Sequence, residues 1–208
     1  MKTISLTILL LGTLLASTYA QNHWKYEYYK TIDHTNFRDN KMFIQSVDFS
    51  KVDYALLNAT IFFLTNEQRA KYKVPILPHN MQCEISAFNH AKHMVEKDFY
   101  SHENTKERKR KFPADRAELA GISNPHIAEN IAYSSFNRSA SYLGIAQIFV
   151  SMWMKSKGHK KNILSKEAKS FGCGLYFSKN TAYSVQVFQW FDDVKIKPAK
   201  DKLPFILE

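Results

Sequence analysis

Four segments of this sequence place polar, reactive side chains directly after an apolar stretch, where they could do acid–base chemistry or bind a metal ion. They are Ser101-His102, Glu129-Asn130, Ser156 and Gly158-His159. Each is weak evidence by itself, because a lone histidine is more often a hydrogen-bonded structural residue than a ligand. Together they are more informative, because the apolar segment before each one would hold it rigidly.

The elements that must position these residues are helices in the first part of the chain and strands at its end. Helices are expected at 53–72, from 79 onwards, at 113–121 and at 141–155, and strands within 123–135, at 171–177 and at 182–190. The residues at 178–181 are typical of a hairpin turn. Because strands and helices do not alternate regularly, the sequence predicts an α+β fold, with a small antiparallel sheet and helices against its faces.

The helix that begins near His79 has one clear apolar stripe. Its members are Met81, Ile85, Phe88, Ala91 and Val95. His90 and His93 fall on the other side, three residues apart, which would suit a metal pair. We favour the simpler interpretation that they belong to a solvated polar face.

The first twenty residues have the features of a secretory signal peptide. Lys2 is followed by an apolar run and by Thr18-Tyr19-Ala20, a small-residue cleavage site before Gln21. No later segment of that length is free of charges. We therefore expect a secreted, extracellular protein, or a periplasmic one in a Gram-negative host. Its predicted parts are the signal peptide (1–20), an N-terminal extension (21–52), one domain (53–190) and a C-terminal tail (191–208).

The extension from 21 to about 50 shows no helical stripe, and we expect an extended arm that lies on the domain or is partly disordered. The whole chain has a formal charge of +10, or +9 without the leader, which holds one lysine and no acid. This surplus favours anionic partners such as phospholipid surfaces or acidic surface polymers. No nucleic-acid-binding motif is present, so nucleic acid is not an expected partner, and we expect a monomer.

Several motifs occur in an order that resembles a known family. They are NEQR at Asn66–Arg69, FYSH at Phe99–His102, PADR at Pro113–Arg116, AEN at Ala128–Asn130, WMKSKGHKKNIL at Trp153–Leu164, GCG at Gly172–Gly174 and VQVF at Val185–Phe188. Over about residues 53–190 the chain resembles the CAP superfamily of cysteine-rich secretory proteins, antigen 5 and pathogenesis-related proteins (SCP-like extracellular domains), and its later motifs resemble the bacterial-type branch. The resemblance implies a three-layer α-β-α sandwich.

The resemblance also implies a central cleft with two histidines and two acids, in which some family members bind zinc or another divalent ion. Here the histidines are His102 and His159, and the first acid is Glu129. Ser156 stands where the second acid is usual, so the set is incomplete. The helix before Ser156 would fix this wall of the cleft, and Gly158 would let the chain turn sharply.

Two imidazoles and a carboxylate can hold a divalent ion and leave positions open for water or a ligand. With His102 and His159 as the only protein ligands, the site would be weak and dependent on pH and metal supply. The alternative is a hydrogen-bonded His–Glu–His–Ser network that ties the helices to the sheet. The sequence leaves both possibilities open.

The favoured function is a binding module that recognises lipid, sterol or a surface glycan without turnover. The alternative is a metal-dependent hydrolase or peptidase, in which Glu129 is the general base and Ser156 orients water. Ser156 could also be a nucleophile with His159 as its base, but no third residue is in place to orient that base.

Two further features have more than one interpretation. The run Lys106–Lys111 could anchor the protein to acidic polymers or anionic membranes, although a solvated loop is the commoner meaning of such a run. Cys83 and Cys173 could form a disulfide in an exported protein, or could equally be two buried thiols.

Overall fold

The computed structural model describes residues 23–137, 139–192 and 195–205. The leader predicted at 1–20 lies outside the described residues. The helices are α1 (Lys41–Ile44), α2 (Tyr54–Lys71), α3 (Met81–Glu96), α4 (Pro113–Leu119), α5 (Tyr142–Lys155) and α6 (Lys157–Ile163), with 3-10 helices at Tyr26–Lys30, Phe37–Asp39 and Arg108–Arg110. The strands are β1 (Ile127–Ser135), β2 (Ser170–Ser178) and β3 (Thr181–Gln189).

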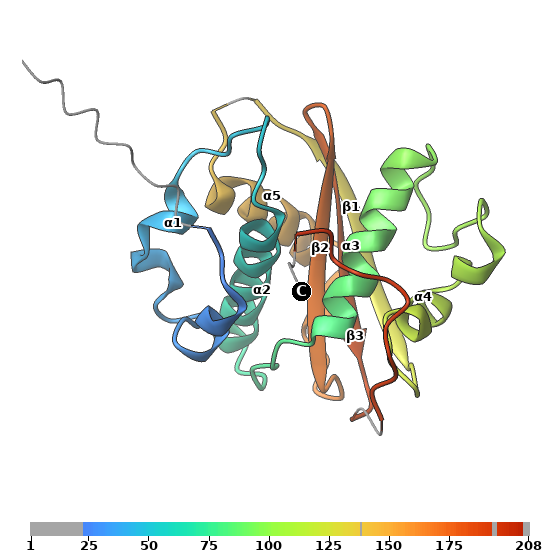
Figure 1. The fold of residues 1–208 in the computed structure, drawn as a ribbon. Helices are drawn as coiled ribbons and strands as arrows, with labels where there is room; N and C mark the ends of the chain where they lie inside the picture. The colour runs from blue at the N-terminus through green and yellow to red at the C-terminus, as the bar shows by residue number, and fades with distance from the viewer. Residues whose placement is uncertain (1–22, 138, 193–194, 206–208) are drawn as a thin grey trace, which may run out of the picture.

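The three strands form one antiparallel sheet between two layers of helices (Figure 1). The strand order is β1-β3-β2, and the hairpin predicted between β2 and β3 is present. Helices α2 and α5 lie on one side of the sheet, and α3 and α4 lie on the other. This arrangement confirms the predicted α+β sandwich. None of the described helices combines the length and the hydropathy needed to cross a membrane.

Local signals in the sequence explain where the long helices begin. Asp53 caps α2 by accepting a hydrogen bond from the backbone N–H of Leu56 at 2.9 Å. Ser141 caps α5 in the same way. Helix α3 begins two residues after the predicted His79, because Asn80 is its cap.

Helix α3 packs unusually close to β2. A Cβ atom at Gly172 or Gly174 would overlap the backbone of α3 at Glu84 or Phe88. The GCG motif therefore exists because only glycine permits this approach of helix and strand. Cys173, between the two glycines, points to the opposite face of the sheet, as expected from the alternation of side chains in a strand.

The two cysteines are free and buried. Cys83 belongs to the core between α3 and the sheet, and Cys173 to the core on the α2 and α5 side. Of the two possibilities that the sequence left open, the structure has two buried thiols.

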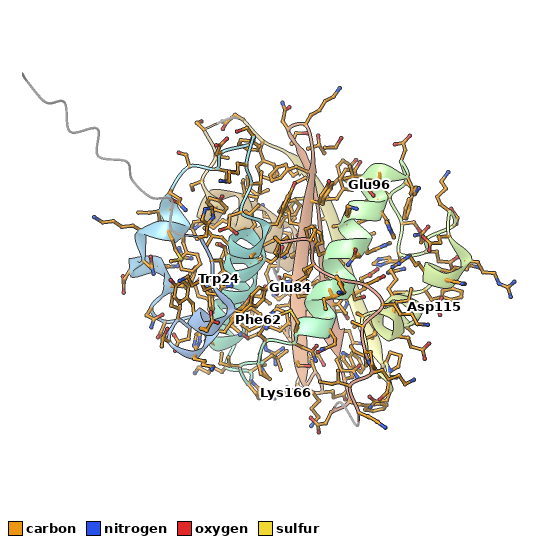
Figure 2. All side chains as sticks on the ribbon, viewed as in Figure 1. Trp24, Phe62, Glu84, Glu96, Asp115 and Lys166 are labelled. Carbon is orange, nitrogen blue, oxygen red and sulfur yellow. The ribbon has the colours of Figure 1, made fainter. Side chains whose placement is uncertain are left out.

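The N-terminal segment, described from residue 23, is not an extended arm. It folds into short helices, and the rings of Trp24, Phe37 and Phe43 are buried against Phe63 of α2. Figure 2 shows Trp24 and Phe62 in this part of the core. The predicted packing on the domain is confirmed, but the extended form is wrong, because the prediction relied on helical periodicity, whereas this segment is ordered by aromatic rings that pack on a distant helix.

Candidate functional site

The motif Glu129-Asn130 lies on β1, which is an edge strand of the sheet. Successive side chains of a strand point to opposite faces. Glu129 accordingly contacts groups on the α3 and α4 side, whereas Asn130 contacts groups on the α2 and α6 side. The motif thus connects two sets of residues that the sheet would otherwise separate.

Glu129 is a buried carboxylate with both oxygen atoms engaged. Its Oε1 accepts a hydrogen bond from Nδ1 of His102 at 2.9 Å, and its Oε2 accepts one from Nη2 of Arg116 at 2.7 Å. Burial alone would raise the pKa of Glu129, but the Arg116 guanidinium and the hydrogen bonds from His102 and Arg116 outweigh it, so the pKa is lowered. Glu129 is therefore ionised near neutral pH.

Arg116 is the buried cation that keeps Glu129 ionised, and its side chain is as inaccessible as that of Glu129. Besides the carboxylate, it donates hydrogen bonds to the backbone carbonyls of Arg110, Lys111 and His102 at 3.0–3.1 Å. One side chain thus fixes both the carboxylate and the loop that delivers His102. The PADR motif indicated this residue, but the sequence did not indicate its role.

His90 lies directly behind this pair and corrects a prediction. Instead of facing solvent, it is fully buried, and its Nε2 donates a hydrogen bond to the backbone carbonyl of Ser101 at 3.0 Å. The same Nε2 lies 3.9 Å from Oε1 of Glu129. Burial lowers the pKa of His90 to about 4, so the ring is neutral. The prediction failed because α4 and the loop after α3 cover this side of the helix.

His159 approaches β1 from the other side. It is half-buried on α6, and its backbone carbonyl accepts a hydrogen bond from Nδ2 of Asn130 at 3.1 Å. The pKa of the His159 ring is lowered by burial and, second, by the imidazole of His102. The two histidines predicted to share a cleft are therefore brought within electrostatic range of each other at the β1 edge.

The turn before His159 differs from the expected one. Gly158 lies inside α6, with no other group near the position of a Cβ, so no sharp turn depends on it. The corner is made by Ser156, a single extended residue between α5 and α6. Its side chain makes no capping hydrogen bond to α6.

Asn130 belongs to a chain of buried amides that the sequence did not predict. Its Nδ2 also donates to Oε1 of Gln186 at 3.0 Å, and its Oδ1 accepts from Nδ2 of Asn162 at 2.9 Å. Gln186 in turn donates to the hydroxyl of Thr65 at 2.7 Å. This chain ties β1 and β3 to α2 and α6. The signal was available, since Gln186 is a polar residue within an otherwise apolar strand run.

The side chains near His102 and His159 limit how many protein ligands a metal ion could have here. Among the described residues, no group of three His, Cys, Asp or Glu side chains is arranged to hold a metal ion. Glu129 is held by Arg116 and stands behind His102, as a carboxylate that orients a metal-binding histidine does. The described residues therefore do not fit an ion with three protein ligands, and only His102 and His159 remain as imidazole donors for one completed by water.

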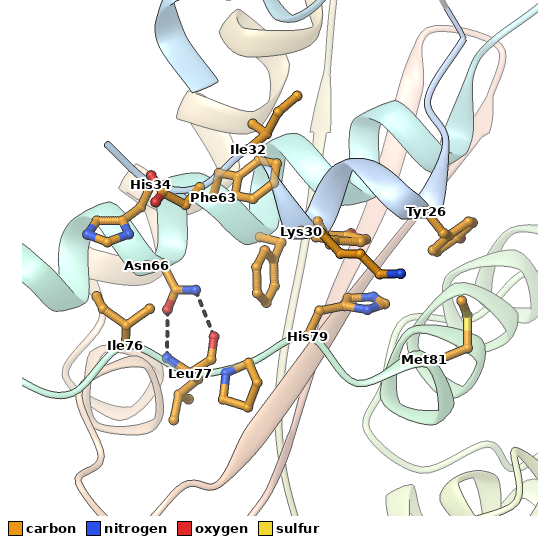
Figure 3. A pocket seen from close by; sticks show the side chains of 14 residues that line it. Tyr26, Lys30, Ile32, His34, Phe63, Asn66, Ile76, Leu77, His79 and Met81 are labelled. Carbon is orange, nitrogen blue, oxygen red and sulfur yellow. Dashed lines mark hydrogen bonds between the residues drawn. The ribbon is translucent and has the colours of Figure 1, made fainter. Parts of the chain in front are cut away.

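A separate cavity of about 460 Å³ lies between the N-terminal segment, α2 and the loop before α3 (Figure 3). Its walls are mostly aromatic and aliphatic. They include Tyr26, Tyr29, Phe62, Phe63, Leu77 and His79. Asn66 fixes one wall through two hydrogen bonds to the backbone of Leu77. The lining does not include His102, Glu129 or His159.

Comparison with known proteins agrees with this geometry. The sequence model of the CAP family, described as the cysteine-rich secretory protein family, matches residues 62–189. This is more than half of the chain, so the protein belongs to that family. The match contains the cleft residues and excludes most of the N-terminal segment.

Three relatives illustrate the range of similar proteins. An extracellular protein with an SCP domain from Bacillus anthracis has a TM-score of 0.55 and 25% identity, over 67% of this chain and 42% of that one. An outer surface protein from Borrelia burgdorferi has a TM-score of 0.52 and 18% identity, over 64% and 92% of the two chains, which shows a shared fold. The Bacillus subtilis protein YlbC, named an uncharacterized membrane protein, is 29% identical over 123 residues. That match covers 58% of this chain and about a third (32%) of YlbC.

Proposed function

We propose that this CAP-domain protein is a secreted binding module that takes its ligand at the cleft of His102 and His159 without turning it over. One observation carries the proposal: both oxygens of Glu129 accept hydrogen bonds from within the protein, one of them from a buried guanidinium. A carboxylate whose two oxygens are both engaged by protein groups is poorly placed to act as a base, so a binding role suits these residues better than turnover.

The same observation weighs against the hydrolase alternative. A general base must accept a proton from water, which requires a pKa near the working pH and a free oxygen within reach. Glu129 has a lowered pKa and is inaccessible, and Arg116 would have to give up its partner for the proton to be accepted. Ser156, which replaces the second acid, does not supply a carboxylate in its place.

A divalent ion such as zinc is part of the proposal. His102 and His159 would hold it, and Glu129 would keep His102 in the tautomer with a free Nε2, because Nδ1 donates to the carboxylate. The ion would supply a positive charge that attracts an oxygen atom of the ligand. Two imidazoles with water make a weak site, so occupancy would follow pH and metal supply.

The proposed ligands are lipid, sterol or glycan of a cell surface, met outside the cell by a monomer. The leader-like first twenty residues and the extracellular description of the Bacillus anthracis protein support this location. YlbC, of which this chain covers 32%, is named a membrane protein, which is in keeping with a ligand at a cell surface. Nucleic acid is not a proposed partner.

The test combines metal analysis with turnover. Purified protein incubated with zinc is expected to retain the metal, and the double variant His102→Ala, His159→Ala to lose it. The matched control is His34→Ala, His126→Ala, which removes two histidines outside the cleft. Retention of zinc by the His102→Ala, His159→Ala variant would contradict the proposal that these two residues hold the ion. Hydrolysis of any substrate in a broad hydrolase panel, abolished by His159→Ala, would refute the absence of turnover.

A further inference from the structure

A dense group of lysines lies on α6 and the residues that flank it, apart from the conspicuously basic run Lys106–Lys111. Residues 155–169 contain six lysines and one acid. The lysines are Lys155, Lys157, Lys160, Lys161, Lys166 and Lys169. Among the described residues, none of these six lies within ion-pair distance of an acidic side chain. We call Lys155, Lys157, Lys160 and Lys161 the α6 lysine surface.

The conspicuous run Lys106–Lys111 is different, because acids partly neutralise it. Residues 103–118 contain six basic and four acidic residues. Arg110 bonds both oxygens of Asp201 and also pairs with Glu107 at 3.0 Å. Lys111 lies 3.7 Å from Glu103. Two of the five basic side chains in this run are therefore paired with acids of the described chain.

The α6 lysine surface is held in place by a buried arginine. Arg69 of α2 donates from Nη1 to the backbone carbonyls of Ile163 and Ser165 at 2.6 and 2.9 Å. At the end of α2, the hydroxyl of Tyr72 accepts a hydrogen bond from Nζ of Lys160 at 3.1 Å. Because two helices are tied together here, the lysines belong to a fixed surface.

An exposed stripe of α5 leads to these lysines. Its members are Gln147, Ile148, Ser151, Met152 and Lys155. They lie on one side of the helix because they are one or three residues apart. Ile148 and Met152 are 42% and 40% exposed. Tyr72, beside Lys160, is 45% exposed. Apolar side chains thus stand in water directly next to lysines that no acid of the described chain neutralises.

We propose that the α6 lysine surface and the α5 stripe together bind an anionic phospholipid bilayer. The lysines would face the lipid phosphates, and Ile148 and Met152 would enter the headgroup region, which is the combination that gives peripheral membrane binding. A soluble polyanion would use the lysines but would gain nothing from the exposed apolar side chains. The proposal does not use the histidine cleft and goes beyond the function proposed for it.

The first test is sedimentation of the protein with vesicles of phosphatidylcholine, alone or mixed with phosphatidylglycerol. Binding to the mixed vesicles alone is expected. The double variant Lys157→Glu, Lys161→Glu should weaken it by at least about 25-fold, since each lysine at an anionic surface contributes about fivefold. The matched control Lys106→Glu, Lys109→Glu reverses two exposed charges of the neighbouring basic run and should weaken it by less than about threefold. Equal losses in both variants would overturn the proposal.

The second test separates a bilayer from a soluble polyanion. The variant Ile148→Ser, Met152→Ser should bind mixed vesicles at low salt but lose the binding that persists at high salt, whereas Ile44→Ser, at another exposed isoleucine, should keep it. Binding to heparin without binding to vesicles would overturn the proposal. The cleft variant His102→Ala, His159→Ala should bind vesicles normally, so failure of the cleft and failure of this surface are distinguishable.

Discussion

Two buried glutamates of this protein, Glu129 and Glu84, each bond a histidine, yet their surroundings differ. Both carboxylates are at most 2% exposed. His102, the partner of Glu129, is 50% exposed, whereas His79, the partner of Glu84, is 12% exposed. The same pair of residue types thus lies once at the surface, with a half-exposed imidazole, and once inside the core.

The neighbours of the two carboxylates also differ. Glu129 is compensated by the guanidinium of Arg116. Glu84, which lies between α3 and α2 (Figure 2), accepts hydrogen bonds from the hydroxyl of Tyr26 at 2.7 Å and from Nδ2 of Asn58 at 3.0 Å. The ring of Tyr29 stacks on His79 at 4.0 Å and covers it.

The difference teaches that a His–Glu pair does not define a site by itself. At Glu129 a buried cation and an exposed imidazole leave one histidine nitrogen available to a ligand. At Glu84 the bonds are directed to Tyr26 of the N-terminal segment and to α2, so that this pair joins parts of the fold. Four predictions would break or sharpen this comparison.

The largest effect is expected for Arg116→Met. Loss of the guanidinium would leave an ionised, buried Glu129 without its cation. The free energy of unfolding should fall by about 3–5 kcal/mol. Urea unfolding would measure the change, with the exposed Arg108→Met as the control that should stay close to wild type. A loss below about 1 kcal/mol would mean that Glu129 does not depend on Arg116.

The stability of the fold should decrease at acidic pH because of the buried groups around Glu129. Since burial lowers the pKa of His90 to about 4, the unfolded chain takes up a proton near the ordinary histidine pKa of about 6.5 while the folded chain does not. The free energy of unfolding should therefore fall by about 3 kcal/mol as the pH drops from about 6.5 to about 4. Glu129, whose pKa is lowered, adds a loss at still lower pH.

Urea midpoints measured across this pH range would test the contribution of His90. His90→Gln should flatten the dependence between neutral pH and about pH 4. The exposed His126→Gln is the control and should leave it unchanged. A wild-type stability that is flat over this interval would contradict a neutral, buried His90.

Replacing each glutamate by glutamine compares the two pairs directly. Glu129→Gln leaves Arg116 buried without a counter-charge and should cost about 3 kcal/mol or more. Glu84→Gln leaves no arginine without its counter-charge and should cost about 1–2 kcal/mol. Both values come from urea unfolding at neutral pH. Equal losses of unfolding free energy in the two variants would show that Arg116 does not cause the difference between the two His–Glu pairs.

The smallest effect is expected for Tyr26→Phe, which removes the hydroxyl that Glu84 accepts from. A loss of about 1 kcal/mol is expected for this hydrogen bond. Tyr28→Phe changes a neighbouring tyrosine whose hydroxyl does not bond Glu84, and it serves as the control. If both variants had the same stability, Glu84 would not anchor the N-terminal segment through Tyr26.

Much of the fold could be predicted because its signals are local. Asp53 and Ser141 cap helices from their own sequence neighbourhood, and the β2–β3 turn joins adjacent strands. The cleft residues His102, Glu129 and His159 could be selected from the order of motifs. Their roles in metal and ligand binding remain predictions.

The errors share one physical cause. His90 was expected in solvent, and the first segment was expected as an arm, because helical periodicity shows which residues form a stripe but not which other segment covers the opposite side. Arg110 was assigned to a solvated loop, yet it pairs with Asp201, ninety-one residues away. Contacts across such distances leave no periodic trace.

The amino-acid sequence by itself determined helices α2 to α5, the hairpin, the α+β class and the family resemblance, because caps, turns and apolar spacing act between near neighbours. The tertiary structure alone decided that Arg116 pairs with Glu129, that Glu84 is buried and that no acid of the described chain lies within ion-pair distance of the α6 lysines. These outcomes depend on which distant charge or ring is brought into contact, and burial then decides how strongly each pair interacts.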